Sequence, residues 1–432
     1  MDYQQSRAYV KDADRYAGGA LDLTNIKELM KRLGNPQDQL KYVHVAGTNG
    51  KGSVIAYLYT TLSEAGYRVG RYISPSVYSY REKMEVAGRS VSRELFAGYV
   101  TRVAVAIEEM TSEGLAHPTP FEIETAVAFL FFAEENCDLV ILEVGMGGNL
   151  DATNIIKNTI LAVLVPISMD HQSFLGNTLS EIAEKKAGII KPGCSVVTAG
   201  QQPETMAVIK NVCAQNNADL TEADLREAKA VKEDFAGQIL EYRGETFELS
   251  LAGSYQTENA ALALEALHVL EKKGYPTTVL QRKKGLKDTR WNGRLTIIHR
   301  DPLFIVDGAH NPAAADMLED SVRKYFKGRK MFFIMGVFRD KDYPYIIRKL
   351  CPYAQQIVTV ETPDNPRALP AGELAEAIKP CNPHVQAANS IEDAVNKVFD
   401  MAGCNDVILS FGSLSFIGQI TAIVKTREEK NS

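Results

Sequence analysis

A glycine-rich turn between two apolar segments constrains this chain more than any other feature. Residues 41–47, "KYVHVAG", predict a buried strand, and residues 53–66, "SVIAYLYTTLSEAG", predict a helix that ends at a glycine. Between them stands "TNGKG". Glycines let the backbone approach a ligand closely, and the amides at a helix N-terminus attract anions. We therefore expect a strand, a phosphate-binding loop and a helix in succession.

The loop departs from the usual G-x-x-x-x-G-K-[ST] motif, because its glycines are closer together and an extra glycine follows the lysine. The alternative is a structural turn that only joins the strand to the helix. The clustering of glycine, lysine and serine favours phosphate binding. Lys51 would reach the β and γ phosphates of a nucleotide, and Ser53 would contact phosphate or Mg²⁺.

Further apolar runs predict the sheet around this loop. Residues 138–145, "DLVILEVG", and 160–167, "ILAVLVPI", are typical of strands that are buried on both faces of a parallel sheet. Their alternation with amphipathic stretches indicates a doubly wound α/β domain that contains the phosphate loop. Residues 237–253 alternate in polarity, which predicts a small antiparallel excursion.

A second series of strand, turn and helix begins near residue 295. It includes "LFIVDGAHNPAAADML", "MFFIMGVF" and "DVILSFGSLSFIG". These patterns predict a smaller, Rossmann-like α/β domain. We therefore expect two domains, an ATP-binding domain over residues 1–295 and a C-terminal domain over residues 296–432.

Composition excludes several functional classes. The net charge is −6 over 432 residues, so no overall positive field would draw the chain to nucleic acid or to an anionic membrane. The six cysteines include no C-x-x-C pair, and the polar N-terminal residues do not resemble a signal peptide. The most apolar run, residues 125–133, is too short to cross a bilayer and predicts a buried helix. We expect a cytoplasmic protein.

Three further residues carry candidate chemistry. Glu143 ends the strand "DLVILEVG" and precedes "MGGN", so its carboxylate would lie near the phosphate loop and could hold Mg²⁺. A helix cap or an ion pair is the alternative for this glutamate. His171 follows another strand, and Lys186 lies in "EKKAGI". From the residues alone, a structural histidine and a solvated lysine remain open.

Several segments together resemble one family. They include "RLGNPQ", "HVAGTNGKGS", "TPFE", "LEVGMGGNLDATN", "DHQSFLG", "EKKAGI", "WNGRL", "VDGAHNPAA" and "GSLSFIG". In content, order and spacing they resemble the folylpolyglutamate synthase and dihydrofolate synthase family, within the Mur ligase superfamily of ATP-dependent amide-forming ligases. The resemblance implies addition of L-glutamate to the carboxylate of reduced folates, and to dihydropteroate as a further substrate, through an acyl phosphate.

The resemblance also implies roles for individual residues. It implies two Mg²⁺ ions held by Ser74, Glu143, His171 and a carbamylated Lys186. It implies a catalytic set of Lys51, Glu143, His171, Lys186, Asp307 and His310. ATP contacts would come from Thr48, Asn49, Gly50, Lys51, Gly52, Ser53, Asn259, Arg294, Asp307 and His310.

The remaining implied roles concern the other substrates. Folate would contact Thr119, Phe121, Glu122, Asn149, Leu150 and Asp151. Glutamate would contact His310 and Ser413, although Gly412 and Ser413 could equally turn the chain into its last helix. The implied partners are ATP, L-glutamate and folates, without nucleic acid or membrane, and a monomer is expected.

Three positions depart from the family pattern. Ser76 stands where histidine is usual after Ser-Pro, Asn149 stands where arginine is usual, and Ser254-Tyr255 replaces Arg-His. Each change removes a cation near the substrate or nucleotide. Two alternatives remain: a peptidoglycan-type Mur ligase, which "RLGNPQ" and "TPFE" disfavour, and a nucleotide-binding switch that performs no synthesis.

Overall fold

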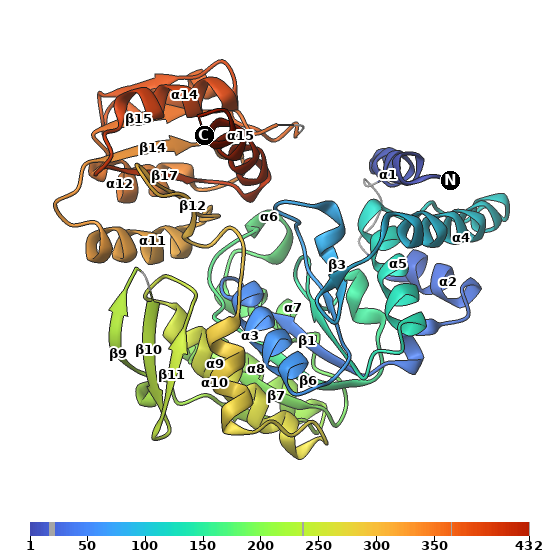
Figure 1. Cartoon of the computed structure of the whole chain (residues 1–432). Coiled ribbons are helices and arrows are strands. Elements are labelled where there is room, and N and C mark those ends of the chain that lie inside the picture. Colours follow the sequence, from blue (N-terminus) through green and yellow to red (C-terminus); the bar gives the residue numbers. More distant parts are fainter. Residues whose placement is uncertain (17–21, 236, 364, 432) are drawn as a thin grey trace. The chain divides into compact units, whose positions relative to one another are not determined.

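The strand that precedes the phosphate loop lies at the centre of the first sheet. In the computed structural model, which describes all residues except 17–21, 236, 364 and 432, β1 (Tyr42–Ala46) pairs in parallel with β5 (Leu139–Glu143) and β6 (Thr159–Leu164) (Figure 1). Every residue of β1 and β5 is buried. Strands without a polar face fit this position, because helices cover both sides of a parallel sheet.

The first sheet has eight strands in the order β4-β3-β2-β5-β1-β6-β7-β8. Only β3 and β4 run antiparallel to their neighbours. The remaining bounds are β2 (Val69–Tyr72), β3 (Met84–Val86), β4 (Arg89–Ser90), β7 (Ser195–Thr198) and β8 (Asp219–Glu222). Strands β2 to β5 lie on one side of β1, and β6 to β8 lie on the other. Open α/β sheets bind ligands at such a point, where successive connections run to opposite sides.

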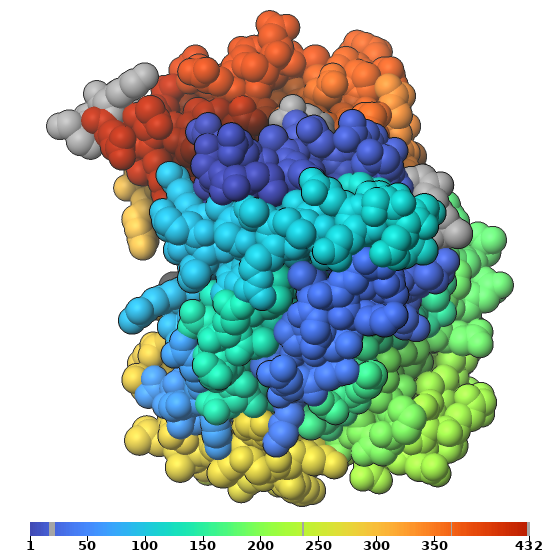
Figure 2. Space-filling model, turned by 90° about the vertical axis from the view of Figure 1, so that its right-hand side faces the viewer, coloured from blue at the N-terminus to red at the C-terminus, as the bar shows by residue number. Residues whose placement is uncertain are grey.

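The helices of this part of the chain supply most of its core. The predicted buried helix is confirmed as α5, whose side chains from 122 to 132 are all buried. The N-terminal helices α1 and α2 pack on α4, as Figure 2 shows from one side. The helices are α1 (Tyr3–Asp12), α2 (Thr24–Arg32), α3 (Lys51–Glu64), α4 (Arg93–Ser112), α5 (Pro120–Glu134), α6 (Gln172–Leu175), α7 (Leu179–Ala187), α8 (Pro203–Gln215), α9 (Gln256–Lys272) and α10 (Val279–Asp288). Within the described residues, none is long and apolar enough to cross a membrane.

A second group of elements contains two further sheets. The predicted antiparallel excursion is confirmed as β9 (Lys229–Asp234), β10 (Gly237–Tyr242) and β11 (Glu245–Leu249). A six-stranded sheet has the order β12-β13-β17-β14-β15-β16, in which only β12 is antiparallel. Its strands are β12 (Thr296–His299), β13 (Leu303–Val306), β14 (Met331–Met335), β15 (Gln356–Thr359), β16 (Val385–Ala387) and β17 (Val407–Phe411).

Helices cover both faces of the six-stranded sheet, with a hydrophobic core on each side. They are α11 (Pro312–Tyr325), α12 (Tyr343–Leu350), α13 (Ala371–Ile378), α14 (Ile391–Met401) and α15 (Ile417–Asn431). The predicted fold class is therefore confirmed: two α/β sheets of the doubly wound type and one small antiparallel sheet.

The chain divides into two compact units whose membership differs from the predicted domains. The first contains Met1–Ser76, Tyr80–Ala228 and Glu258–Asp288, and the second contains Val77–Ser79, Lys229–Thr257 and the residues from Thr289 onward. The antiparallel strands join the second unit because Glu233 accepts from the hydroxyl of Tyr325 (3.1 Å) and Phe235 packs on Phe326. The functional boundary at residue 295 stays a prediction.

Candidate active site

The loop between β1 and α3 has the geometry of an anion cradle. Gly47 (φ +134°) and Gly50 (φ +103°) lie in the left-handed region that favours glycine. A Cβ on Gly47 would stand 2.3 Å from Val165, so no other residue fits there. Gly50 is also the N-cap of α3 and provides no side chain for the first amides of the helix. These amides can therefore bind a phosphate group.

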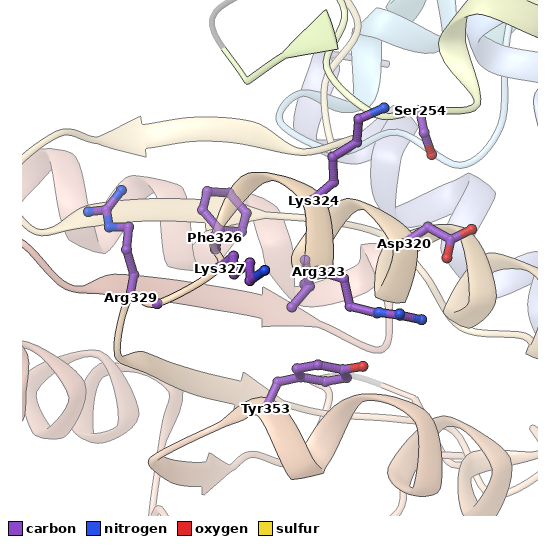
Figure 3. Close-up of a pocket in the computed structure, with 10 residues that line it drawn as sticks. Ser254, Asp320, Arg323, Lys324, Phe326, Lys327, Arg329 and Tyr353 are labelled. Atoms are coloured by element: carbon purple, nitrogen blue, oxygen red, sulfur yellow. The ribbon is translucent and has the colours of Figure 1, made fainter.

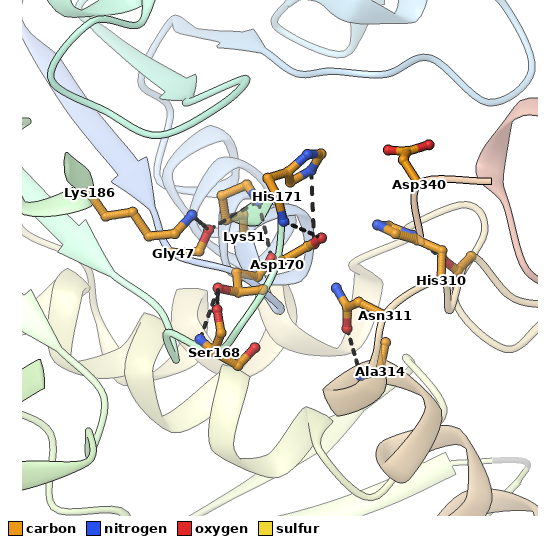
Figure 4. Close-up of polar contacts among 12 residues, drawn as sticks. Gly47, Lys51, Ser168, Asp170, His171, Lys186, His310, Asn311, Ala314 and Asp340 are labelled. Atoms are coloured by element: carbon orange, nitrogen blue, oxygen red, sulfur yellow. Dashed lines mark hydrogen bonds and ion pairs between the residues drawn. The ribbon is translucent and has the colours of Figure 1, made fainter. Parts of the chain in front are cut away.

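Two lysines converge on a single carbonyl of this loop. Lys51 Nζ donates to the carbonyls of Gly47 (3.4 Å) and Thr48 (3.2 Å), and Lys186 Nζ donates to the carbonyl of Gly47 (2.8 Å) (Figure 4). Lys186 lies on α7 and is only 6% exposed. Burial, reinforced by the charge of Lys51, lowers the pKa of Lys186 to about 7. The structure thus brings two predicted site residues together and places one in a poorly solvated position.

The segment after β6 completes this side of the loop. Thr48 Oγ1 accepts from the amide of Ser168 (3.0 Å) and donates to its carbonyl (3.1 Å). His171 follows with φ +51°, its amide donates to Asp170 Oδ1 (2.8 Å), and its Nε2 lies 3.9 Å from Asp170 Oδ2. Asp170 also acts electrostatically on Lys186 and opposes the lowering of its pKa. In the sequence, Asp170 was marked only by its position beside His171, and we predicted a role for His171 alone.

Glu143 and Ser74 lie side by side at the ends of adjacent strands. The amide of Ser74 donates to Glu143 Oε2 (3.1 Å), and both Glu143 and Ser53 are buried. Among the described residues, no three His, Cys, Asp or Glu side chains converge on a possible metal site. One buried carboxylate at the end of the strand beside β1 nevertheless fits Mg²⁺, which keeps waters and binds substrate phosphates besides one or two carboxylates.

Asn259, from α9, lies directly against the loop. A Cβ on Gly50 would stand 2.5 Å from Asn259 Oδ1. This contact joins residues that are more than 200 positions apart. It places the predicted ATP contact next to the N-terminus of α3.

A cavity of about 760 Å³ in the same unit collects most of the predicted folate residues. Thr119, Phe121, Glu122, Leu150 and Asp151 line it. Asn149 does not line it; its amide donates to the carbonyl of Lys185 (2.9 Å), so this residue holds the end of α7. The predicted metal ligand Ser74 lines the cavity as well, and so does Gly145, which lies two residues after Glu143.

Sequence reasoning missed two aromatic rings of this cavity. Tyr16 and His117 both line it and stack with ring centroids 4.2 Å apart at 18°. Phe121 stacks in the same way on Tyr72, at 6.1 Å and 25°. Flat walls of this kind suit an aromatic ligand. No motif marked Tyr16 or His117, because single aromatic residues at ordinary spacing carry no local signal.

Two carboxylates of the cavity also organise its backbone. Glu122 Oε2 accepts from the amide (2.7 Å) and hydroxyl (2.9 Å) of Thr119, which is a capping box at the start of α5. Asp151 Oδ2 accepts from the amide of Met146 (2.9 Å). These bonds hold the loop after β5 and the first turn of α5 in place.

A buried chain of hydrogen bonds connects Asp151 to β1. Asp151 Oδ1 accepts from the hydroxyl of Thr153 (2.5 Å), and Thr153 Oγ1 lies 2.9 Å from His44 Nε2. Because the Thr153 hydrogen is used toward Asp151, His44 Nε2–H is the donor. Burial lowers the pKa of His44 to about 3, so the imidazole is neutral. The chain fixes one wall of the cavity to the strand that precedes the loop.

In the second unit, the turn after β13 gathers three predicted residues. Asp307 accepts from the amides of Leu295 (2.9 Å) and Ala309 (2.8 Å). Burial raises the pKa of Asp307, and the guanidinium of Arg294 opposes that shift. His310 Nδ1 lies 2.7 Å from the carbonyl of Gly308 and donates to it.

Ser413 has a local role in the structure. Its hydroxyl accepts from the amide of Ser415 (3.2 Å) and lies 2.8 Å from the Ser415 hydroxyl at the start of a short 3-10 helix. This geometry fits the structural turn that we weighed against glutamate binding. The glutamate role of Ser413 stays a prediction.

Comparison with known proteins gives consistent matches over the whole chain. The Mur ligase middle domain matches residues 45–267, and the Mur ligase glutamate ligase domain matches residues 293–414. The dihydrofolate synthase/folylpolyglutamate synthase of Bacillus subtilis (strain 168) is 35% identical over 98% of this chain and 99% of its own length.

Solved structures agree. Mycobacterium tuberculosis folylpolyglutamate synthase complexed with ADP and AMPPCP has a TM-score of 0.87 at 30% identity, covering 98% of this chain and 99% of that chain. An FPGS–AMPPCP–folate complex has a TM-score of 0.82 at 29% identity, covering 99% and 100%. The chain belongs to the Mur ligase superfamily and, within it, to the family of folylpolyglutamate and dihydrofolate synthases.

Proposed function

We propose that the chain is an ATP-dependent ligase that joins L-glutamate to the carboxylate of reduced folates. The observation that carries this proposal is that Ser74 belongs to both parts of the site. It lines the 760 Å³ cavity, and its backbone amide donates a hydrogen bond to Glu143. The phosphate side of the site and an aromatic-walled substrate cavity therefore adjoin. The AMPPCP and folate complexes of its relatives support ATP and folate as substrates.

The chemistry follows from the poor leaving ability of a carboxylate oxygen. The substrate carboxylate attacks the γ phosphorus of ATP, which forms an acyl phosphate and releases ADP. The glutamate amine then attacks the acyl carbon and loses a proton, and the tetrahedral intermediate expels inorganic phosphate. Lys51 and the α3 amides would hold the phosphoryl oxygens, where they stabilise the charge that develops during transfer.

The residues at the loop fit Mg²⁺ as a cofactor. Glu143, Ser53 and Ser74 would hold one ion beside the nucleotide phosphates. Bound Mg²⁺ would neutralise charge on the transferring phosphoryl group. The predicted ligands of a second ion are His171 and a carbamylated Lys186.

The environment of Lys186 supports the carbamate. An amine with a pKa of about 7 has a substantial neutral fraction at physiological pH, and a neutral amine adds CO₂ to give a carbamate anion and a proton. Carbamylation would replace a buried cation beside Lys51 with oxygen donors that suit Mg²⁺. Asp170, which acts electrostatically on Lys186, joins this set in our proposal.

Folate would lie in the cavity against Phe121 and the Tyr16–His117 stack, with Thr119, Glu122, Leu150 and Asp151 around it. Asn149 would act through its hold on α7. Dihydropteroate is proposed as a second substrate, because it presents similar ring systems and a carboxylate. In the second unit, Arg294, Asp307 and His310 would serve ATP, and His310 with Ser413 would serve glutamate. A monomer in the cytoplasm stays our prediction.

Product analysis tests the proposal. The purified chain is supplied with ATP, Mg²⁺ and glutamate, and with tetrahydrofolate and dihydropteroate in separate reactions. We expect ADP, phosphate and a product enlarged by glutamate in each reaction. ATP hydrolysis that is independent of folate and glutamate would favour the nucleotide switch, and glutamylation of a UDP-linked muramyl substrate instead would favour a peptidoglycan-type ligase.

A further inference from the structure

A second cavity, within the second unit, is strongly basic. It measures about 720 Å³ and lies around the C-terminal end of α11 and the turn that follows. Arg323, Lys324, Lys327 and Arg329 line it together with a single carboxylate, Asp320 (Figure 3). The chain as a whole carries a net charge of −6, so this local excess of positive charge is unusual for the molecule.

The four cations differ in the ion pairs and hydrogen bonds that they form. Lys324 forms an ion pair with Glu233, and Arg329 donates to the carbonyls of Asn405 (2.9 Å) and Asp406 (3.1 Å). Carbonyl contacts leave the guanidinium charge uncompensated. With respect to the described part of the chain, Arg323 and Lys327 make no ion pair or side-chain hydrogen bond, so two cations remain available to a ligand.

Helix stability does not account for the whole group. Cations in the last turn of a helix favour its dipole, which explains Arg323 and Lys324. Lys327 and Arg329 lie beyond the end of α11, in a turn closed by the bond from the amide of Arg329 to the carbonyl of Phe326 (3.0 Å). This turn brings both cations back to the cavity that the helix lines.

The cavity also has an apolar floor and a ring at its edge. Val322 and Phe326 are almost completely buried, and the ring of Tyr353 is partly exposed. The Tyr353 hydroxyl donates to Glu319 (2.9 Å), which Lys349 also neutralises (3.1 Å), so this nearby carboxylate is compensated. A suitable ligand would combine several anionic groups with aliphatic carbon.

We propose that this cavity binds an oligo-γ-glutamate chain. Such a chain carries a free carboxylate on every residue, for Arg323, Lys327 and Arg329, and two methylenes in every link, which can pack on the exposed part of the Tyr353 ring. An oligophosphate shares the repeated negative charge but lacks the aliphatic part. The choice of γ-glutamate rests on the proposed function, because repeated addition of glutamate produces this tail.

A binding measurement on the whole chain tests the inference without turnover. Tri-γ-glutamate without a pteridine is titrated by calorimetry while AMPPCP and Mg²⁺ saturate the phosphate loop. We expect the R323Q/K327Q variant to bind about fivefold more weakly than the unmodified chain, because it loses two exposed ion pairs. The matched control K210Q/K425Q removes two exposed lysines elsewhere and should bind as the unmodified chain does.

The binding results distinguish γ-glutamate from an oligophosphate as the ligand. Equal affinity of tri-γ-glutamate for the unmodified chain and R323Q/K327Q, or no binding at all, overturns the proposal. Tripolyphosphate that binds the cavity more tightly than tri-γ-glutamate overturns the assignment to γ-glutamate. Failure of the unmodified chain to join glutamate to folate would contradict the proposed function and leave the binding result intact.

Discussion

The turn after β1 and the turn after β13 occupy equivalent places in two sheets and solve the same problem differently. Each follows the carboxyl end of a parallel strand and leads into a helix. The first has Gly50 at the N-cap of α3 and two lysines on the carbonyl of Gly47. In the second, Asp307 accepts two backbone amides, and Asn311 Oδ1 accepts from the amide of Ala314 (2.9 Å) to cap α11.

The difference lies in where the anion comes from. The first turn leaves helix amides and cations for an anion that the chain does not contain, whereas the second turn supplies its own carboxylate and cap. Changes in the first turn should therefore affect catalysis more than stability. Changes in the second turn should affect stability at least as much as they affect catalysis.

The largest effect is expected from K51A. Loss of the ammonium group beside the transferring phosphoryl group should lower kcat by about 10³-fold or more, because a preorganised charge contributes most in the transition state. The thermal midpoint should change little, since the hydrogen bonds of Lys51 go to carbonyls of its own loop. Steady-state kinetics and a thermal melt measure both; a rate near that of the unmodified chain would remove the ATP role of this turn.

Lys186 provides the next test. K186R should lose about 10²-fold or more in kcat, because a guanidinium cannot be carbamylated and does not bind Mg²⁺. K186M should be equally inactive but at least as stable as the unmodified chain, since it removes an ionisable group from a poorly solvated position. K185M is the matched control, because Lys185 is half-buried, lies next to Lys186 on α7 and donates to the carbonyl of Phe174.

The carbamate itself can be observed. Intact mass under bicarbonate should show the addition of one CO₂, absent from K186R and present in K185M. An active enzyme that carries only a free amine at Lys186 would contradict the second metal site.

In the second turn, D307N should lower the free energy of unfolding by about 2 kcal/mol. The amide can accept only one of the two backbone N–H groups and turns a donor toward the other. Chemical denaturation measures the change. Unchanged stability together with a large loss of activity would mean that Asp307 serves catalysis, as the first turn does. The proposed difference between the two turns would then be wrong.

The smallest effect is expected from N311A, which removes the cap of α11. We expect a loss of about 1 kcal/mol in the free energy of unfolding, the usual value for such a cap. N311S retains a capping hydroxyl and should recover most of the loss. Failure of N311S to recover it would show that Asn311 does more than cap the helix.

The sequence predicted those features that depend on local pattern. Apolar runs identified β1, β5 and β6, and the glycines marked the phosphate loop, because backbone freedom and periodicity act over a few residues. The contact of Lys186 with Gly47 and that of Asn259 with Gly50 join distant segments. The family resemblance assigned Lys186 and Asn259 to the site, but it indicated neither of these contacts. The Tyr16–His117 stack had no signal, since tertiary packing alone brings its two rings together. The cations of the basic cavity stand close together in the sequence, within residues 323–329, but we drew no prediction from that run.

Transfer of ¹⁸O tests the acyl phosphate most directly. The chain is supplied with ATP, Mg²⁺, glutamate and tetrahydrofolate whose reacting carboxylate is labelled with ¹⁸O. We expect one labelled oxygen in the inorganic phosphate released with each amide formed, because the carboxylate oxygen that attacks the γ phosphorus leaves with phosphate. Amide formation with unlabelled phosphate would contradict the account.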